Sequence, residues 1–317
     1  MGYRKLISFG DASYVISLPK DWVQKNGLKK GDELLVDIHA NSVNVSPIGS
    51  KSLDDNSSKE VSIEYTADNY RFKAELIYAY INNYHIINIF GNELHKHSIE
   101  IRKIVQGFAA LEVVQQSSNK IVLKDMLDFS DVSAFDILRR VDRIVLSMAE
   151  DVQNALKGNM EGCFESLEQK ESDVNRLTNL IFKVLRRGLE HSGGGKVGLS
   201  TEDIFYYWEL ALFIEKIGDQ LKRIPRHLKG KVEPHIIDAY NALVEQYKLA
   251  MKANFTKSLP LALDVIANKG PIFNKLDYCT NNNPSEYIYF LEKMRIMNIY
   301  CGNIAKTLLK MGIGVKP

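Results

Sequence analysis

The sequence predicts a multidomain chain with a small β-rich module first, a small α/β sandwich next, and an all-α half at the end. Three observations predict this order. The chain has 317 residues, too many for one typical hydrophobic core. Its apolar pattern changes twice, from short β-rich runs to alternating strands and helices, and then to long helices. The helical part also repeats itself after 99 residues.

The N-terminal segment is predicted to form two strands, a short helix and two further strands. The runs YRKLISFG and SYVISL are rich in β-branched and aromatic residues, and Gly10-Asp11 supplies a turn between them. Pro19 opens the helix KDWVQKNG because its fixed φ suits a first helical turn, and Gly27 ends that helix. The strands ELLVDI and SVNVSP follow around Ala40-Asn41. We assign residues 1–48 to this first domain.

A change of composition separates this module from the rest. Residues 49–59 are small, polar and rich in turn formers, which is typical of a linker. Residues 60–129 then alternate strands and helices, which predicts a small α/β domain. The expected elements are the strand EVSIEYT, the helix DNYRFKAELIYAYINNY, the strand HIINIF, the helix ELHKHSIEIRKIVQGFA, and the strands LEVVQQ and KIVLKD. No catalytic constellation is found among them.

The remainder of the chain is helical and consists of two related halves. A shift of 99 positions aligns residues 163–177 with residues 262–276 without a gap, and the apolar stripe of the preceding helix aligns as well. We therefore expect two units of three helices, residues 130–230 and residues 231–317. The expected helices are residues 134–157, 161–190, 201–228, 234–256, 259–280 and 285–312. The connections at Gly193-Gly194-Gly195 and at Asn281 to Pro284 end the second helix of each unit.

Charge and cysteine content limit the classes of function. The chain has 41 basic and 39 acidic residues, so any binding of nucleic acid must be local. Residues 1–30 provide such a place, because six basic and two acidic side chains give them an excess of +4. The cysteines Cys163, Cys279 and Cys301 lie far apart, which disfavours disulfides and cysteine metal sites. We expect a cytoplasmic protein, since no membrane span or signal peptide is evident.

The first domain resembles the SpoVT/AbrB family of transition-state regulators and antitoxins. The resemblance rests on the string RKLISFGDASYVISLPKDWVQKNGLKKGDELLVDI, which matches nearly the whole family motif. It implies an AbrB-like swapped-hairpin β-barrel, in which two chains interleave their hairpins and place basic strands and loops on DNA. Physical reasoning also predicts a homodimer, because about 45 residues with few large apolar side chains cannot support an independent core.

By matching positions, Arg4, Lys5, Ser13 and Lys20 are the expected contacts to double-stranded DNA. Arginine and lysine neutralise phosphates, and a β hairpin can approach a groove. The alternative is that the module only dimerises and that its lysines are solvated charges. Asp11 departs from a neutral or basic hairpin tip and could weaken binding.

The helical half, from about residue 130 to 312, resembles PhoU, the phosphate-uptake regulator built from two three-helix bundles. The stretch LALFIEKIGDQLKRIP carries the resemblance: Glu215 to Asp219 match the family signature one for one, and Arg223-Ile224 takes the place of an Asn-Ile pair. Some archaeal PhoU-like regulators join an AbrB module to a PhoU module, and this sequence looks like that architecture.

The PhoU resemblance implies metal binding by paired acidic motifs. Glu171, Glu215 and Asp219 are the candidate ligands, and oxygen ligands suit a divalent or iron-type ion. Two departures limit the expectation to one partial site in the first unit. Asn175 replaces a second acid, and the second unit has Gly270 in place of Glu171. In the last helix of the second unit, Arg295 and Ile296 align with Gly218 and Asp219 of the first unit. A structural ion pair of Asp219 with Lys222 or Arg223 is the equally weighted alternative.

These features predict a transcription regulator of phosphate homeostasis, whose DNA-binding module is joined to a PhoU-like sensor or relay domain. No enzyme is expected, because no nucleophile–base pair, phosphate loop or redox motif is found. The alternative is a protein adaptor that acts on phosphate transporter components or signalling proteins, in which the AbrB-like module serves only dimerisation.

Overall fold

The computed structural model describes residues 3–10, 13–39, 42–47, 59–66, 68–129, 132–190, 199–283 and 285–311. The chain divides into an N-terminal unit that ends at residue 57 and a larger unit, residues 58–317, which we call the body. Several sequence-based expectations lie outside the described residues. They are the turn at Asp11, the turn at Ala40-Asn41, the linker up to residue 58, the connection at Gly193-Gly194-Gly195, and Pro284.

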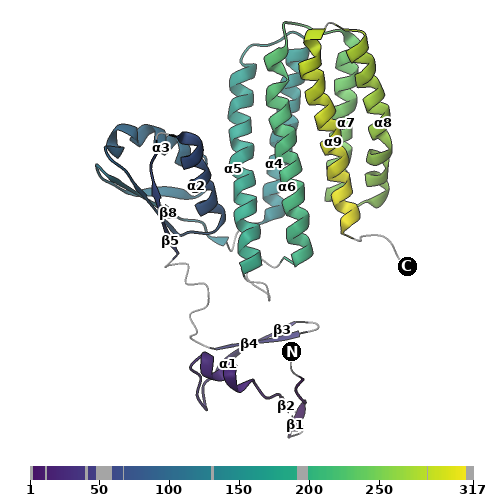
Figure 1. The fold of residues 1–317 in the computed structure, drawn as a ribbon. Coiled ribbons are helices and arrows are strands. Elements are labelled where there is room, and N and C mark those ends of the chain that lie inside the picture. Colours follow the sequence, from purple (N-terminus) through teal and green to yellow (C-terminus); the bar gives the residue numbers. More distant parts are fainter. Residues whose placement is uncertain are drawn as a thin grey trace. The chain divides into compact units, whose positions relative to one another are not determined.

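The N-terminal unit consists of two hairpins and one short helix (Figure 1). Its elements are β1 (Ile7–Phe9), β2 (Ser13–Val15), α1 (Lys20–Lys25), β3 (Leu34–His39) and β4 (Ser42–Pro47). Strands β1 and β2 pair antiparallel, as do β3 and β4. Pro19 is the N-cap of α1, and Gly27 follows the helix with a φ of +66°, as the sequence predicted.

The first strand is shorter than expected. The prediction began it at Tyr3, whereas β1 begins at Ile7, so Arg4 and Lys5 precede the strand. The reason is that β1 pairs only with the three residues of β2, between the partners Ile7–Val15 and Phe9–Ser13. No described strand of the same chain extends this ladder toward the N-terminus.

The described side chains of this unit do not form an interior. None of the side chains that the structure describes in it is buried. Phe9 is 73% exposed and Tyr14 is 71% exposed, although both belong to strands. Other large apolar side chains of the unit that are more than half exposed are Tyr3, Leu6, Ile7, Ile16, Leu35, Val36 and Val43.

The body begins with a four-stranded sheet in the order β5-β6-β8-β7. Parallel strands β5 and β6 are joined through helix α2, whereas the β6–β8 and β8–β7 pairs are antiparallel. The elements are β5 (Glu60–Glu64), α2 (Asn69–Ile81), β6 (Ile86–Phe90), η2 (Leu94–His97), α3 (Ser98–Val105), β7 (Leu111–Gln116) and β8 (Lys120–Asp125). The last two strands have the predicted bounds.

One face of this sheet packs on the helices. Alternate residues of the strands, among them Ile63, Ile87 and Leu123, are buried with Phe72 and Leu76 of α2. The second predicted helix is divided into the 3₁₀ turn η2 and α3. The helical segment starts only after Glu93, because this residue has a left-handed φ of 55°.

Six long helices complete the body and form two groups of three (Figure 1). The first group is α4 (Ala134–Leu156), α5 (Cys163–Glu190) and α6 (Thr201–Arg223), and the second is α7 (Pro234–Phe255), α8 (Leu259–Asn281) and α9 (Ile288–Lys310). Helix α6 packs against α9 and α4 against α7, so the two groups share one continuous apolar core. The predicted pair of three-helix bundles is therefore present.

The helix ends follow from individual residues. Ser200 and Asp203 form a reciprocal capping box at the start of α6. The prediction extended this helix to residue 228, but it ends at Arg223 and is followed by the 3₁₀ turn η4 (Pro225–His227). Pro225 has no N–H group to continue the α-helical ladder, which explains the earlier end. Similarly, the turn η5 (Ser285–Tyr287) precedes α9, so α9 begins three residues later than predicted.

A buried ion pair joins the α/β domain to the helical bundle. The Lys183 side chain of α5 is 0% exposed, and its Nζ lies 2.8 Å from Oδ2 of Asp125 at the end of β8. The same amino group donates to the carbonyl oxygen of Tyr80 at 3.0 Å and lies 4.6 Å from the centre of the Tyr80 ring. The positive charge of Lys183 on α5 is thus neutralised by residues of the α/β domain, and this contact holds the α/β domain on α5.

In the described part of the chain, the helices are too short or too polar to cross a membrane.

Candidate functional site

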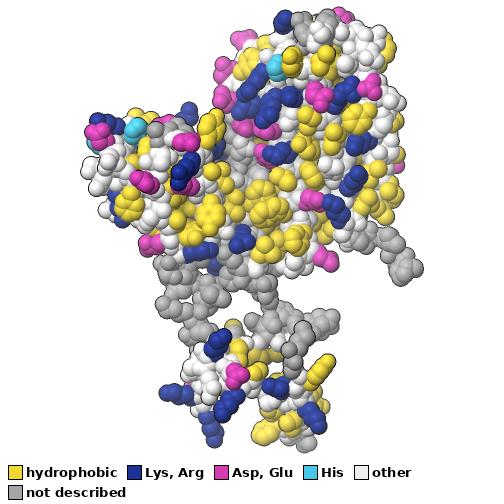
Figure 2. All heavy atoms as spheres, in the orientation of Figure 1, with side chains coloured by type: hydrophobic (Ala, Val, Ile, Leu, Met, Phe, Trp, Pro, Cys, Tyr) yellow, Lys and Arg dark blue, Asp and Glu magenta, His cyan; other side chains and the backbone are white. Residues whose placement is uncertain are grey.

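The four residues predicted to contact DNA are all exposed in the N-terminal unit. Arg4 and Lys5 lie just before β1, and Ser13 begins β2 opposite Phe9, so these three belong to one hairpin. Lys20 begins α1, the next element of the chain. Figure 2 shows Lys and Arg side chains next to hydrophobic side chains on the visible face of this unit. The arrangement presents positive charge and uncovered apolar surface together.

The three predicted metal ligands lie on two neighbouring helices of the first bundle. Glu171 of α5 accepts hydrogen bonds from Lys222 Nζ at 2.9 Å and from Asn175 Nδ2 at 2.8 Å. Glu215 of α6 lies 3.1 Å from Nζ of Lys216. One turn further along α6, Asp219 accepts from Nη2 of Arg223 at 2.9 Å. Each predicted ligand is therefore paired with a cationic side chain.

The three carboxylates also affect one another. Burial raises the pKa of Glu215, Lys216 lowers it, and the charges of Asp219 and Glu171 raise it further, with a net increase above the usual value. A negative charge at Glu215 is consequently less stable here than in water. Lysine and arginine side chains, which reach it and its neighbours from α6, supply the compensating charge.

In the structure, cationic side chains occupy the positions around these three carboxylates. Among the described residues, no three histidine, cysteine, aspartate or glutamate side chains come together as a possible metal site. A metal ion at Glu171 or Asp219 would compete with Lys222 or Arg223 for the carboxylate. The ion pair expected as the alternative is present between Asp219 and Arg223, whereas Lys222 reaches across to α5. Metal binding by these three acids stays a prediction.

The second bundle lacks this arrangement. Arg295, which the sequence placed opposite Gly218, pairs with Asp277 and donates to Thr280 Oγ1 at 3.0 Å. The predicted register therefore places a cation where α6 has Gly218, and an apolar side chain, Ile296, where α6 has Asp219.

Sequence reasoning missed a groove between the α/β domain and α5. One cavity of about 640 Å³ is lined by Glu171, Asn175 and Lys222, with Lys73 of α2 and Lys103 of α3 on the other side. A second cavity of about 630 Å³ adjoins it and shares Lys103, Gly107, Phe108, Gln169 and Ser172 with it. The only signal in the sequence was a polar face on α5, which the periodic pattern could not distinguish from a face in contact with solvent.

Comparison with known families separates the same two parts of the chain. Residues 7–52 match the family model of the antidote-toxin recognition protein MazE, a bacterial antitoxin, and residues 138–227 match the model of the PhoU domain. Among solved structures, the crystal structure of PhoU from Pseudomonas aeruginosa is similar, with a TM-score of 0.50 and 16% sequence identity. The similarity covers 57% of this chain and 96% of that chain. No curated protein sequence matches the chain.

The two family matches and the structural similarity agree with the resemblances found in the sequence. The chain carries an AbrB/MazE-like segment followed by a PhoU-like helical region. At 16% identity the structural similarity establishes the fold of the helical region. It assigns no ligand or partner to this chain.

Proposed function

We propose that the chain is a cytoplasmic, homodimeric, DNA-binding transcriptional regulator of phosphate uptake or metabolism, and that its PhoU-like region senses or relays phosphate status. The proposal rests on one observation: two different modules occur in the same chain. The first is an exposed basic β module that matches an antitoxin family, and the second is a helical region that matches the PhoU domain. The function requires binding and relay, and no enzymatic step.

The dimer is supported by the exposed apolar side chains of the N-terminal unit. A unit in which no described side chain is buried gains little stability by itself. A second copy would cover side chains such as Phe9 and Tyr14 and extend the short β1–β2 ladder. The same pairing would bring two sets of Arg4, Lys5, Ser13 and Lys20 to one surface, which suits a duplex that has two equivalent strands.

DNA contact is supported by the position of the basic residues. Arg4 and Lys5 lie at the free edge of a hairpin, where each could neutralise one phosphate and release its counterion. A β ribbon also fits the width of a major groove.

A salt titration tests this function. The full chain is titrated with a pool of 40-bp duplexes over a range of salt concentrations, and we expect the logarithm of the affinity to fall linearly with the logarithm of the salt concentration. Arg4→Ala/Lys5→Ala should reduce the magnitude of the slope by about 2 in the monomer and about 4 in a dimer that uses both sets.

The matched control removes two exposed lysines of the body, Lys248→Ala/Lys252→Ala, and should leave the slope unchanged. Absence of duplex binding at low salt, or equal slopes for both double variants, would contradict DNA binding by the N-terminal unit.

The adaptor function is the second candidate, because the body has an exposed apolar surface of its own. Phe205 is 67% exposed on α6, and with Trp208 and Leu212 it lines a depression of about 460 Å³ beside the end of α9. A partner protein, such as a phosphate transporter component or a signalling protein, would be captured there. A chain with Phe205→Ser that loses this partner but keeps duplex binding would assign the two activities to separate surfaces.

Metal binding at Glu171, Glu215 and Asp219 is a separate proposal that follows from the PhoU resemblance. Elemental analysis of the purified chain tests it. A Glu215→Ala/Asp219→Ala variant that retains all the metal of the parent chain would exclude these residues as ligands.

A further inference from the structure

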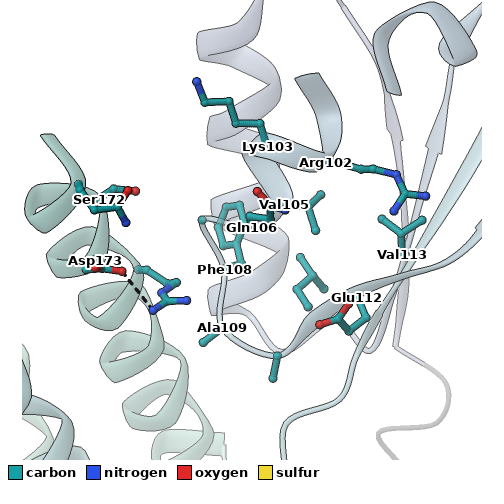
Figure 3. Close-up of a pocket in the computed structure, with 15 residues that line it drawn as sticks. Arg102, Lys103, Val105, Gln106, Phe108, Ala109, Glu112, Val113, Ser172 and Asp173 are labelled. Carbon is teal, nitrogen blue, oxygen red and sulfur yellow. Dashed lines mark ion pairs between the residues drawn. The ribbon is translucent and has the colours of Figure 1, made fainter. Parts of the chain in front are cut away.

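The groove between the α/β domain and α5 has one helical wall. Gln169, Ser172, Asp173 and Arg176 follow one another at helical spacing on a single face of α5 and line the cavity of about 630 Å³. Figure 3 shows Ser172 and Asp173 on this helix, facing the segment that carries Gln106, Phe108 and Ala109. This wall is therefore predominantly polar and charged.

The opposite wall is the loop that connects α3 to β7, and it is held in place from behind. The Phe108 ring is buried 5.1 Å from the ring of Tyr80, whose hydroxyl donates to the carbonyl oxygen of Ala109 at 2.9 Å. The carbonyl oxygen of Ala110 accepts from the amide of Met126 at 2.8 Å, and Ala110 has a left-handed φ of 57°. The wall is therefore formed before any ligand arrives, which reduces the entropic cost of binding.

A donor in the groove is left without an acceptor. Asp173 holds Nη2 of Arg176 at 3.1 Å, which is the dashed ion pair of Figure 3. The Nε atom of Arg176 is buried, yet it has no hydrogen-bond partner among the described residues. The Arg176 side chain as a whole is 39% exposed and lines the cavity, so an anion in the groove would gain a charge-assisted hydrogen bond from its guanidinium.

The charges around this donor favour an anion that also carries donor groups. The cavity is lined by the cations Arg102, Lys103 and Arg176 and by the acids Glu112 and Asp173, an excess of one positive charge. Asp173 already pairs with Arg176, and Arg102 donates to the neutral Gln116 at 2.8 Å. Lys103 is exposed at the place shared by both cavities. Glu112 remains to accept from a hydroxyl or amino group.

We propose that this groove binds a small organic anion, such as a nucleoside phosphate or a hydroxycarboxylate, whose oxyanion is held by Arg176 and Lys103 while its hydroxyl or amino groups donate to Glu112. A volume of about 630 Å³ is typical of pockets for small organic molecules and far exceeds one inorganic phosphate ion. The site lies in the body and is independent of the proposed DNA contacts at Arg4 and Lys5.

Calorimetric titration of the full chain tests the site. The probes are AMP, glucose 6-phosphate, citrate and glutamate, with adenosine and inorganic phosphate as the two halves of AMP. We expect at least one organic anion to bind once per chain with a Kd below about 1 mM, about 4 kcal/mol of binding free energy. Lys103→Met and Arg176→Gln should each weaken that probe about tenfold or more, because a charge-assisted hydrogen bond is lost.

Two controls separate this site from others. Lys96→Met removes an exposed lysine of the same α/β domain that does not line the groove, and Arg4→Ala/Lys5→Ala removes the cations assigned to DNA. Both should bind the probe as the parent chain does.

Three results would overturn the proposal. The first is that none of the four organic anions binds. The second is that inorganic phosphate binds as tightly as the best of them. The third is that binding survives Lys103→Met, whose exposed side chain is not needed for folding.

Discussion

In the N-terminal unit none of the described side chains is buried, whereas in the body even the lysine at position 183 is fully enclosed. The two parts of the chain therefore obtain their stability from different sources. The body closes its own core and neutralises its own buried charge. The N-terminal unit leaves Phe9 and Tyr14 uncovered, and the proposed dimer would cover them. If the N-terminal unit pairs as proposed, its stability should rise with protein concentration, whereas the stability of the body, which is set within one chain, should not change.

The largest expected effect tests how the body neutralises its charge. Asp125→Ala leaves Lys183 buried without its counterion and should lower the free energy of unfolding by about 3–5 kcal/mol. Glu245→Ala, which removes the partner of the exposed Lys248, should cost at most about 1 kcal/mol. Chemical denaturation followed by circular dichroism measures both. Equal losses in Asp125→Ala and Glu245→Ala would show that Lys183 is hydrated in solution. The body would then not neutralise a buried charge, and the contrast with the N-terminal unit would weaken.

The next effect concerns pairing of the N-terminal unit. Phe9→Ser removes an apolar side chain that we expect to be covered in the dimer, so the dimer dissociation constant should rise about ten- to a hundredfold. Phe205→Ser changes an equally exposed apolar residue of the body and should leave that constant unchanged. Sedimentation equilibrium measures the constants. A parent chain that is monomeric at all concentrations would contradict the proposal that the N-terminal unit pairs with a second copy.

A smaller effect is expected inside the body, where hydrogen bonds join the two bundles. The buried Tyr240 hydroxyl of α7 donates to the carbonyl oxygen of Ala149 in α4 at 2.8 Å. Tyr240→Phe should lower the free energy of unfolding by about 0.5–1.5 kcal/mol, and the loss should be the same at every protein concentration. If the loss of unfolding free energy grew on dilution, the stability of this contact would depend on dimerisation.

The smallest effect is one of pH. Because burial raises the pKa of Glu215 in the folded chain, the folded state binds more protons than the unfolded state above the usual glutamate pKa of 4.5. Its contribution to stability is therefore lost as pH rises through the folded pKa. Glu215→Gln should melt at a higher temperature relative to the parent chain at pH 7.5 than at pH 5. A difference in melting temperature that is constant over this range would show that Lys216 compensates the burial fully.

Local pattern in the sequence was enough to predict the regular elements. The strands Leu111–Gln116 and Lys120–Asp125 have the predicted bounds, since their runs of β-forming residues end at clear turn signals. Errors arose where a second segment decides the outcome. The first strand begins only at Ile7 because no described strand pairs with the residues before it, and the third long helix ends at Arg223 because Pro225 follows too soon.

The candidate site was less predictable because its contacts join distant residues. Asp219 pairs with Arg223 one helical turn away, one of the two ion-pair partners that helical spacing had offered. Lys222 instead reaches Glu171 on another helix, and only the packing angle of the two helices determines that contact. Lys183 lies in the apolar run LIFKVL of α5, and its partner Asp125 lies at the end of a strand in a different domain, so local pattern does not predict this pair.

The pair of Lys183 and Asp125 also has a consequence for how such chains can diverge. Replacing Asp125 alone leaves Lys183 buried without a counterion, and replacing Lys183 alone leaves Asp125 buried without one. The first substitution would therefore be harmful, and only a second one at the partner position would restore fitness. In relatives that share this domain junction, we expect the two positions to change together or not at all. Exposed pairs such as Lys248 and Glu245 carry no such constraint, and their positions should drift independently.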